Sequence, residues 1–434
     1  MIEKPPVLQV LQSDVIIDEP LKEIITDINN NYYYWSEIKY RTPNGVNPNE
    51  LWEMVKSIRK QTEIQVWDFD NIHFSLTNSM QRECHIFDMN FGGSWGASKI
   101  FPDDKTTQEL YLISSIMEEA IASSQMEGAS TTREAAKEML RKKISPRDKS
   151  QQMILNNYNT INFIRTHSQT DLTPELVMTI HGMMTENALE IKDAAGRFRR
   201  QEENIVVGNG ITGETVHTPP SADCLPLFLE KLCEYFNDRD PKIFIHPIIR
   251  GIIIHFLIGY YHPFADGNGR TARALFYWYM MRSNYWLVQY LSISRIIRGS
   301  KKAYEKAYLY SENDNNDIGY FIKYNLEVLY KSFNALSQYI QRKHKEKKKA
   351  EKLMHLGDIS ERESIILNMY IEDPDLILVS TTLISRFGIS ANTAKSDLKD
   401  LTKKGYLKEI SINGRTKGYI KSELFFDKIE KIRN

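Results

Sequence analysis

The fold is decided by the stretch Tyr261-His262-Pro263-Phe264-Ala265-Asp266-Gly267-Asn268-Gly269-Arg270-Thr271-Ala272-Arg273. Residues 248–261, which lead into it, are almost wholly apolar and predict a buried helix. That helix must break where His262 meets Pro263, because the residue before a proline avoids the α region. Residues 271–282 resume as an apolar, aromatic-rich helix. The sequence therefore places a histidine, a carboxylate, two glycines, an asparagine and two arginines between two core helices.

These residue types together predict an anion site. Gly267 and Gly269 permit positive φ and close backbone approach, so successive N–H groups can form a concave nest for a phosphate. A helix that starts near Arg270 points its N-terminus, with free N–H groups and a positive dipole end, at the same place. Arg270 and Arg273 lie three residues apart, hence on one helical face, where both guanidinium groups can fork onto phosphate oxygens.

A base and a metal ligand accompany the anion site. Asp266 is a hard oxygen ligand suited to a magnesium ion held partly by phosphates. His262, with a pKa near neutrality, can take a proton from an incoming hydroxyl. The alternative is that His262 and Asp266 only cap the two helices and that the glycines make a turn. The full set of residues favours attack on a bound nucleoside triphosphate over that structural interpretation.

The same stretch resembles the signature of the Fic family, His-x-Phe-x-Asp/Glu-Gly-Asn-Gly-Arg-x-x-Arg, and matches it at every fixed position. Fic proteins are α-helical enzymes that mostly transfer AMP from ATP onto a hydroxyl of a target protein. The resemblance implies a role for each residue: His262 is the general base, Phe264 anchors the loop, Asp266 binds Mg²⁺, Gly267, Asn268 and Gly269 cradle the α- and β-phosphates, Arg270 holds the phosphates, and Arg273 reaches the γ-phosphate.

A second short motif lies on a helical pattern between residues 110 and 140. Glu127 before Gly128 is typical of a helix end with glycine at the C-cap, and a glutamate there is usually solvated. However, Ser123, Glu127 and Gly128 resemble the Fic inhibitory motif Ser/Thr-x-x-x-Glu-Gly/Asn. The resemblance implies that Glu127 pairs with Arg273. A carboxylate in that position competes with the γ-phosphate for the arginine and repels the triphosphate, which predicts an off-switch.

A β-hairpin is predicted at residues 204–218, where the helical pattern gives way to apolar residues around a glycine-rich tip. It resembles the Fic flap, the hairpin over the active site that pairs with the backbone of the target and positions its hydroxyl; we call residues 204–218 the flap. The exposed strand edge, with Ile205, Val206 and Val207, suits such β-augmentation. The alternative is a small structural hairpin.

Composition excludes several classes of protein. The 434 residues suffice for two or three domains, and the 56 Lys and Arg balance the 56 Asp and Glu, so the chain as a whole is neither basic nor acidic. The three cysteines form neither a disulfide framework nor a recognisable ligand set for a metal. With neither a signal peptide nor a membrane-spanning apolar run in the sequence, we expect a cytoplasmic protein without membrane contact.

The chain divides into four predicted regions, and the fold class is mainly α. Residues 1–105 form an N-terminal region that packs on the core, and residues 106–340 form a Fic-type helical bundle with the flap. Residues 341–354, rich in lysine and without an apolar face, form a linker. Residues 355–434 resemble a winged helix-turn-helix, with three helices before a hairpin that turns at Asn413-Gly414.

The winged-helix region is rich in basic residues. Between residues 380 and 421 there are nine Lys and Arg against three Asp and Glu. Asn392, Lys395 and Lys399 of the predicted third helix can face a DNA duplex, with Arg415 at the wing. Winged helices also serve as protein-docking or dimerisation modules, so DNA and a protein partner are equal alternatives.

The sequence thus predicts a Fic-type protein adenylyltransferase that uses ATP and Mg²⁺, acts on a Tyr, Ser or Thr hydroxyl of a target protein or of itself, and is inhibited by Glu127. A kinase of the Doc type is disfavoured, because that variant departs from Gly-Asn-Gly-Arg. Removal of AMP by water with the help of Glu127 fits the same residues. A DNA-binding regulator with a nucleotide-sensing core is the non-enzymatic alternative. Homodimers are frequent in the family, so the resemblance also implies one.

Overall fold

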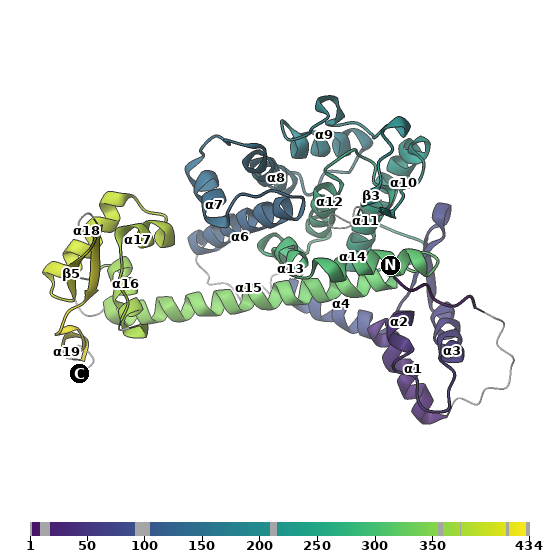
Figure 1. Ribbon diagram of the computed structural model, residues 1–434, viewed down its shortest axis with the longest axis horizontal. Coiled ribbons are helices and arrows are strands. Elements are labelled where there is room, and N and C mark those ends of the chain that lie inside the picture. Colours follow the sequence, from purple (N-terminus) through teal and green to yellow (C-terminus); the bar gives the residue numbers. More distant parts are fainter. Residues whose placement is uncertain are drawn as a thin grey trace. The chain divides into compact units, whose positions relative to one another are not determined.

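The computed structural model describes residues 2–8, 18–91, 105–208, 215–354, 359–373, 375–413 and 416–430 (Figure 1). The chain divides into two compact units, Met1–Leu336 and Ser337–Asn434. Among the described residues, no helix combines the length and the apolar character needed to cross a membrane. The described secondary structure is mainly helical, as the sequence predicts.

The N-terminal region of the first unit is a helical layer with one hairpin. Its elements are α1 (Glu19–Asn31), α2 (Trp35–Ile38), α3 (Pro48–Gln61), β1 (Glu63–Trp67), a 3₁₀ turn (Asp68–Asp70), β2 (Ile72–Ser75) and α4 (Asn78–Phe91). A buried ion pair network attaches this layer to the helical core. Lys56 of α3 lies 2.8 Å from both Asp314 and Asp317, and the Tyr32 hydroxyl donates to Asp317. The region therefore packs on the core, as expected.

The core of the first unit is a bundle of helices. Its elements are α6 (Lys105–Met126), α7 (Arg133–Lys142), α8 (Lys149–Thr166), α9 (Pro174–Thr185), 3₁₀ turns (Lys192–Ala194, Gln201–Glu203, Ala222–Cys224), β3 (Val207–Gly208), β4 (Thr215–His217), α10 (Leu225–Asn237), α11 (Pro247–Tyr261), α12 (Asn268–Arg282), a 3₁₀ turn (Trp286–Tyr290), α13 (Ile293–Gly299), α14 (Lys301–Asn313) and α15 (Gly319–Met354). The long helix α15 continues past residue 336, where the second unit begins.

Helices α11 and α12 form the centre of this bundle, and both are buried along nearly their whole length. A helix that is apolar on all sides is stable only when neighbours cover every face. Helix α11 ends at His262, which has left-handed backbone angles (φ 46°, ψ 56°), and Pro263 follows. Helix α12 begins at Asn268 directly after Gly267, whose φ is 85°. It therefore starts two residues before Arg270, so Asn268, Gly269 and Arg270 form its first turn.

The flap is a hairpin with shorter strands than the sequence suggested. Val207 pairs with His217 and Gly208 pairs with Thr215 in antiparallel register, while Ile205 and Val206 precede the strand. The tip of the flap, residues 209–214, lies outside the described residues. Pro219-Pro220 ends the hairpin because neither residue has an N–H to continue the ladder.

The second unit has its own hydrophobic core, built from helices and one hairpin. Its elements are α16 (Glu361–Glu372), α17 (Ser380–Phe387), α18 (Ala391–Lys403), β5 (Leu407–Asn413), β6 (Thr416–Lys421) and α19 (Phe425–Glu430). Ser390 caps α18 by accepting the N–H of Thr393, and Gly388 ends α17 with φ 65°. This order of elements is the one that the sequence predicted; the winged helix-turn-helix assignment stays a prediction.

Candidate active site

His262 is the C-cap residue of α11, and its imidazole has a backbone partner. Its Nδ1 lies 3.1 Å from the carbonyl oxygen of Gly259. Because a carbonyl only accepts, Nδ1 carries the proton and Nε2 is the unprotonated nitrogen. Burial lowers the pKa of His262 to about 4, and the hydrogen bond to Gly259 only partly opposes that shift. The imidazole is therefore neutral at pH 7 and able to accept a proton.

The loop that follows His262 is fixed by Asn268 and His181. The Asn268 side chain accepts the N–H of Phe264 at 2.9 Å and donates to the Phe264 carbonyl at 2.7 Å. Both of its polar atoms therefore form hydrogen bonds within the loop. The ring of the buried Phe264 stacks on the imidazole of His181, with centroids 3.8 Å apart. Nε2–H of His181 donates to the Asp266 carbonyl at 2.8 Å, and its Nδ1 accepts the N–H of Gly196 at 3.0 Å.

His181 is thus a positioning residue that the sequence interpretation missed. It lies on α9, 81 residues before His262 along the chain. Burial lowers its pKa to about 4, so it is neutral and keeps one donor and one acceptor. Nothing near His181 in the sequence distinguishes it from an ordinary core histidine; only the tertiary contact with the loop reveals its role.

Asp266 presents a carboxylate at the surface of the loop, and its side chain is about half exposed (49%). Oδ1 accepts the N–H of Gly267 and lies 3.3 Å from Nη2 of Arg270. These contacts orient the carboxylate and leave it accessible. Among the described residues no group of three or more His, Cys, Asp or Glu side chains is placed to hold a metal ion. Asp266 therefore suits a cation that brings most of its oxygen ligands with it.

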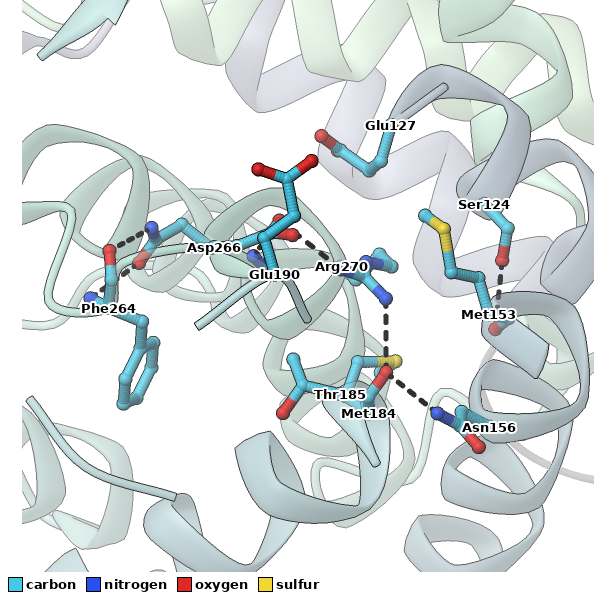
Figure 2. Close-up of polar contacts among 12 residues, drawn as sticks. Ser124, Glu127, Met153, Asn156, Met184, Thr185, Glu190, Phe264, Asp266 and Arg270 are labelled. Carbon is cyan, nitrogen blue, oxygen red and sulfur yellow. Dashed lines mark hydrogen bonds and ion pairs between the residues drawn. The ribbon is translucent and has the colours of Figure 1, made fainter. Parts of the chain in front are cut away.

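Arg270 and Arg273, for which the resemblance implied different roles, have different surroundings. The Arg270 side chain is fully buried, donates to the carbonyl of Met184 at 3.0 Å, and contacts Asp266 (Figure 2). Its guanidinium ties α12 to the end of α9. Arg273 also lies on α12, but its guanidinium reaches the cavity described below. The role of Arg270 in holding phosphates stays a prediction, because its described contacts are with the Met184 carbonyl and the Asp266 carboxylate.

Arg273 pairs with the helix that carries the second motif. Its Nε donates to Oγ of Ser123 at 2.9 Å, and its Nη2 donates to the Ser123 carbonyl at 3.2 Å. The same Nη2 lies 2.9 Å from Oε1 of Glu127. The Glu127 side chain is 30% exposed, and the Arg273 side chain is 2% exposed. Gly128 follows with φ 96° and ends α6. The ion pair implied by the resemblance is therefore formed.

The carboxylate of Glu127 lies directly against the N-terminus of α12. A methyl group added at Gly269 would collide with Oε1 of Glu127 and stand 3.1 Å from Nη1 of Arg273. Gly269 belongs to the first turn of α12, where backbone N–H groups have no partner within the helix. An anion is stabilised at such a place by those N–H groups and by the helix dipole. Glu127 thus occupies the position that the sequence assigns to a phosphate.

A cavity of about 330 Å³ opens beside these groups. It is lined by His262, Gly269 and Arg273 of the site and by Glu127 at the end of α6. The flap and α14 complete the walls, with Val207, Gly208, Val216, His217, Lys301, Tyr304, Glu305, Tyr308, Leu309 and Glu312. Mixed apolar, aromatic and charged walls of this size fit a nucleotide. Tyr304 and Tyr308 therefore line the cavity, a question that the sequence left open.

The flap is held over the cavity from both of its ends. His217 contacts the carbonyl of Tyr260, and Arg199 donates from Nε to the carbonyl of His262 at 2.9 Å and from Nη2 to the carbonyl of Pro220. The sequence interpretation assigned no separate role to Arg199 or His217. The side chain of Val206, the residue before β3, is 47% exposed.

The predicted DNA contacts lie in the second unit, and three of the four are described. Asn392, Lys395 and Lys399 are exposed on α18. Their spacing of three and four residues puts them on one helical face. Arg415 lies outside the described residues.

Residues 171–280 match the model of the Fic/DOC family. The chain is 33% identical over 129 residues to a protein adenylyltransferase Fic of Nematostella vectensis, a match that covers 29% of this chain and 26% of that protein. It is 34% identical over 109 residues to protein adenylyltransferase fic-1 of Caenorhabditis elegans, a match that covers 25% of this chain and 19% of that protein. The matches thus span about a quarter or less of these relatives.

The fold is also similar to that of a solved structure. A Fic family protein from Desulfovibrio desulfuricans G20 superposes with a TM-score of 0.50 at 17% identity, over 81% of this chain and 98% of that chain. This similarity shows a shared fold. The matched residues 171–280 include α11, the loop from His262 to Gly267 and nearly all of α12, which carry every fixed position of the signature. Through this segment, the chain is similar to the Fic/DOC family.

Proposed function

We propose that this protein transfers AMP from ATP to a hydroxyl group of a protein and that Glu127 restrains the transfer. The observation that carries the proposal is the Glu127 carboxylate, which lies on the N-terminus of α12 and is paired with Arg273. The Glu127 carboxylate supports an anion site at the N-terminus of α12. This site lies on the wall of a cavity that is also lined by the neutral His262. The names of the relatives, protein adenylyltransferases, support the same reaction.

His262 supplies the base for the proposed reaction. The hydroxyl oxygen of the target forms a bond to the α-phosphorus of ATP while its proton moves to Nε2 of His262. The bond from the α-phosphorus to the bridging oxygen breaks, and pyrophosphate leaves. The Gly259 carbonyl holds Nδ1–H, so the ring keeps the tautomer that accepts at Nε2. General base catalysis of this kind contributes roughly 10²–10⁴-fold.

Backbone N–H groups and Arg273 bind the negatively charged phosphates of the nucleotide. The N–H groups at the start of α12 point toward the phosphates, and preorganised donors of this kind are often the largest contribution to catalysis. Arg273, freed from Glu127, binds the terminal phosphate. Asp266 fits a magnesium ion because it is an accessible oxygen ligand beside the phosphate site. When bound with ATP, Mg²⁺ would neutralise charge on the phosphates.

The target approaches through the flap. The open edge at Ile205 and Val206 supports pairing with an extended segment of the target, whose Tyr, Ser or Thr hydroxyl then reaches His262. Pairing through backbone hydrogen bonds depends on the extended shape and register of the target segment more than on its side chains. A segment of this protein itself therefore also qualifies as an acceptor.

The proposal is tested by intact-mass spectrometry of the Glu127→Gly protein after incubation with ATP and Mg²⁺. We expect an adduct with the mass of AMP, which the wild type acquires more slowly and the Glu127→Gly/His262→Ala protein does not acquire. A phosphate adduct would assign a kinase instead. An AMP adduct that persists without His262 would reject the assigned base. If no adduct forms, the same proteins are incubated with a proteome and labelled ATP, and absence of labelling there would reject the transferase.

For residues 355–434 we propose DNA as the partner. The exposed face of α18 carries Asn392, Lys395 and Lys399, and residues 380–421 have nine basic against three acidic side chains. A polar and basic helix face of this kind suits the major groove, with lysines at the phosphates.

A further inference from the structure

His217, the last residue of β4, has both of its ring nitrogens engaged by oxygen acceptors. Nε2 lies 2.7 Å from the carbonyl oxygen of Tyr260 on α11. Nδ1 lies 3.0 Å from Oε2 of Glu312 on α14. The His217 side chain is 9% exposed and that of Glu312 is 21% exposed, so neither contact is an ordinary surface ion pair.

These two acceptors require an imidazolium. A carbonyl oxygen and a carboxylate oxygen only accept, so each ring nitrogen must carry a hydrogen. A neutral imidazole has one N–H and would leave one of the two oxygens facing a lone pair. The geometry by itself therefore specifies the charged form of His217.

The charges around His217 agree with this assignment. Burial and the guanidinium of Arg199 oppose the charged form, and His262 on the loop after α11 is neutral. The phenol ring of Tyr260 lies 5.2 Å from the imidazole and carries no charge near pH 7. The carboxylate of Glu312 and the Tyr260 carbonyl outweigh the opposing effects, so the pKa of His217 is raised above 6.5.

One cation thus joins three parts of the proposed site. His217 belongs to the flap, Tyr260 stands two residues before the base His262, and Glu312 lies on the helix that forms the far wall of the cavity. Both His217 and Glu312 line that cavity. Loss of the charge would release the flap from α14 and weaken its hold on α11.

We propose that His217, as an imidazolium, is a positioning residue that locks the flap to α11 and α14, and that transfer to a docked hydroxyl requires this lock. The proposal rests on the proposed AMP transfer for its effect on rate, but the lock itself is a property of the fold. It adds a switch that is separate from Glu127, because it acts on the target side of the cavity.

The lock has a defined dependence on pH. A group whose pKa is raised by folding stabilises the folded arrangement below its unfolded pKa of about 6.5, and this contribution is lost as pH rises through the folded pKa. His262 acts in the opposite sense, because the base must be neutral and its pKa is about 4. Activity is therefore limited by His262 on the acid side and by His217 on the alkaline side.

The lock is tested first without activity, by long-range ¹H–¹⁵N spectra of the imidazoles in the full-length Glu127→Gly protein. We expect His217 to show two protonated nitrogens at pH 6 and a pKa above 6.5. Adding Glu312→Gln should lower that pKa below 6.5 and speed hydrogen exchange at the amides of residues 215–217 about tenfold. His167→Gln, at an exposed histidine that ends α8, is the matched control and should change neither quantity. A neutral His217 at pH 6 would overturn the proposal.

The effect on transfer is tested by the pH profile of AMP incorporation in the same background. His217→Gln should lower kcat about tenfold at pH 7, with the KM for ATP changed less than threefold, and should remove the alkaline loss of activity. His217→Lys keeps a cation and should restore kcat and extend activity to higher pH. An unchanged alkaline limb in His217→Gln would reject the role in catalysis. If the Glu127→Gly parent shows no transfer, the proposed function fails, and the spectra and exchange rates still decide whether the lock exists.

Discussion

In the proposed mechanism, Glu127 and a bound phosphate require the same two partners, the guanidinium of Arg273 and the first turn of α12. The ion pair measures 2.9 Å, and Gly269 leaves just enough space for the carboxylate. A residue without a side chain is needed there, because any Cβ would meet either the glutamate or the phosphate that replaces it. At the residue scale, the proposed inhibition and the proposed catalysis thus depend on one glycine as much as on the charged pair.

Gly269→Ala separates these two functions. The added methyl group should expel Glu127 from α12 and at the same time obstruct the phosphates, so activity should not rise as it does for Glu127→Gly. In the Glu127→Gly background the same change should slow AMP incorporation on the order of a hundredfold, because a displacement of about 1 Å in the reacting groups has that cost. Mass spectrometry over time measures both rates. A Gly269→Ala protein as active as Glu127→Gly would show that the phosphates lie elsewhere.

Residue identities alone did not assign every role at the site. The resemblance implied that both Arg270 and Arg273 contact phosphates, yet the guanidinium of Arg270 is buried against Met184 and only that of Arg273 reaches the cavity. His181, Arg199 and His217 hold the loop and the flap through contacts between residues 40 to 90 positions apart. No local pattern marks such contacts, because they arise only when separate helices meet.

At the scale of elements, the sequence was most informative where the pattern was strongest. The apolar run before Pro263 is α11, as the sequence predicted. The flap was harder to delimit. Its strands pair over only two positions in the described residues, because a short hairpin at the edge of a helical bundle has little periodicity to recognise.

The element that decides the proposed DNA binding is α18. Lys395→Gln combined with Lys399→Gln should weaken binding of a duplex and reduce the slope of log affinity against log salt by about 2, since each phosphate contact contributes about 0.9. Fluorescence anisotropy with a labelled duplex measures the slope. Lys142→Gln with Lys331→Gln, at exposed lysines of the first unit, is the control with the same change in charge. An unchanged slope, or no binding by the parent, would favour a protein partner.

At the scale of the whole molecule, three histidines are held neutral inside the first unit. Burial lowers the pKa of His255 to about 3 and those of His181 and His262 to about 4. In an unfolded chain each would titrate near 6.5, so the unfolded state binds more protons at acid pH. Stability is therefore fully present above pH 6.5 and is lost as pH falls toward 4.

We expect the first unit to lose stability steeply between pH 6.5 and 4. All six tryptophans lie within residues 35–286, so tryptophan fluorescence in urea reports on this unit alone. Residues 359–434 contain no histidine, so this dependence on pH should be absent from their own stability. The urea midpoint of the first unit should fall as pH is lowered from 7 to 5. An unchanged midpoint would mean that these histidines are not buried as neutral groups.

The sequence by itself determined the helical class, the break at His262-Pro263, the catalytic signature and the glutamate that pairs with Arg273. The helical class and the break are specified by adjacent residues or by a helical period, for which short-range sterics and burial suffice. The catalytic roles and the pairing of Glu127 with Arg273 came from the resemblance to the Fic family. Only the tertiary structure decided which histidines hold the loop and the flap, and how Lys56 joins the N-terminal layer to Asp314 and Asp317. Those outcomes depend on which buried polar groups find partners across the fold, and such pairing is settled only when distant segments pack together.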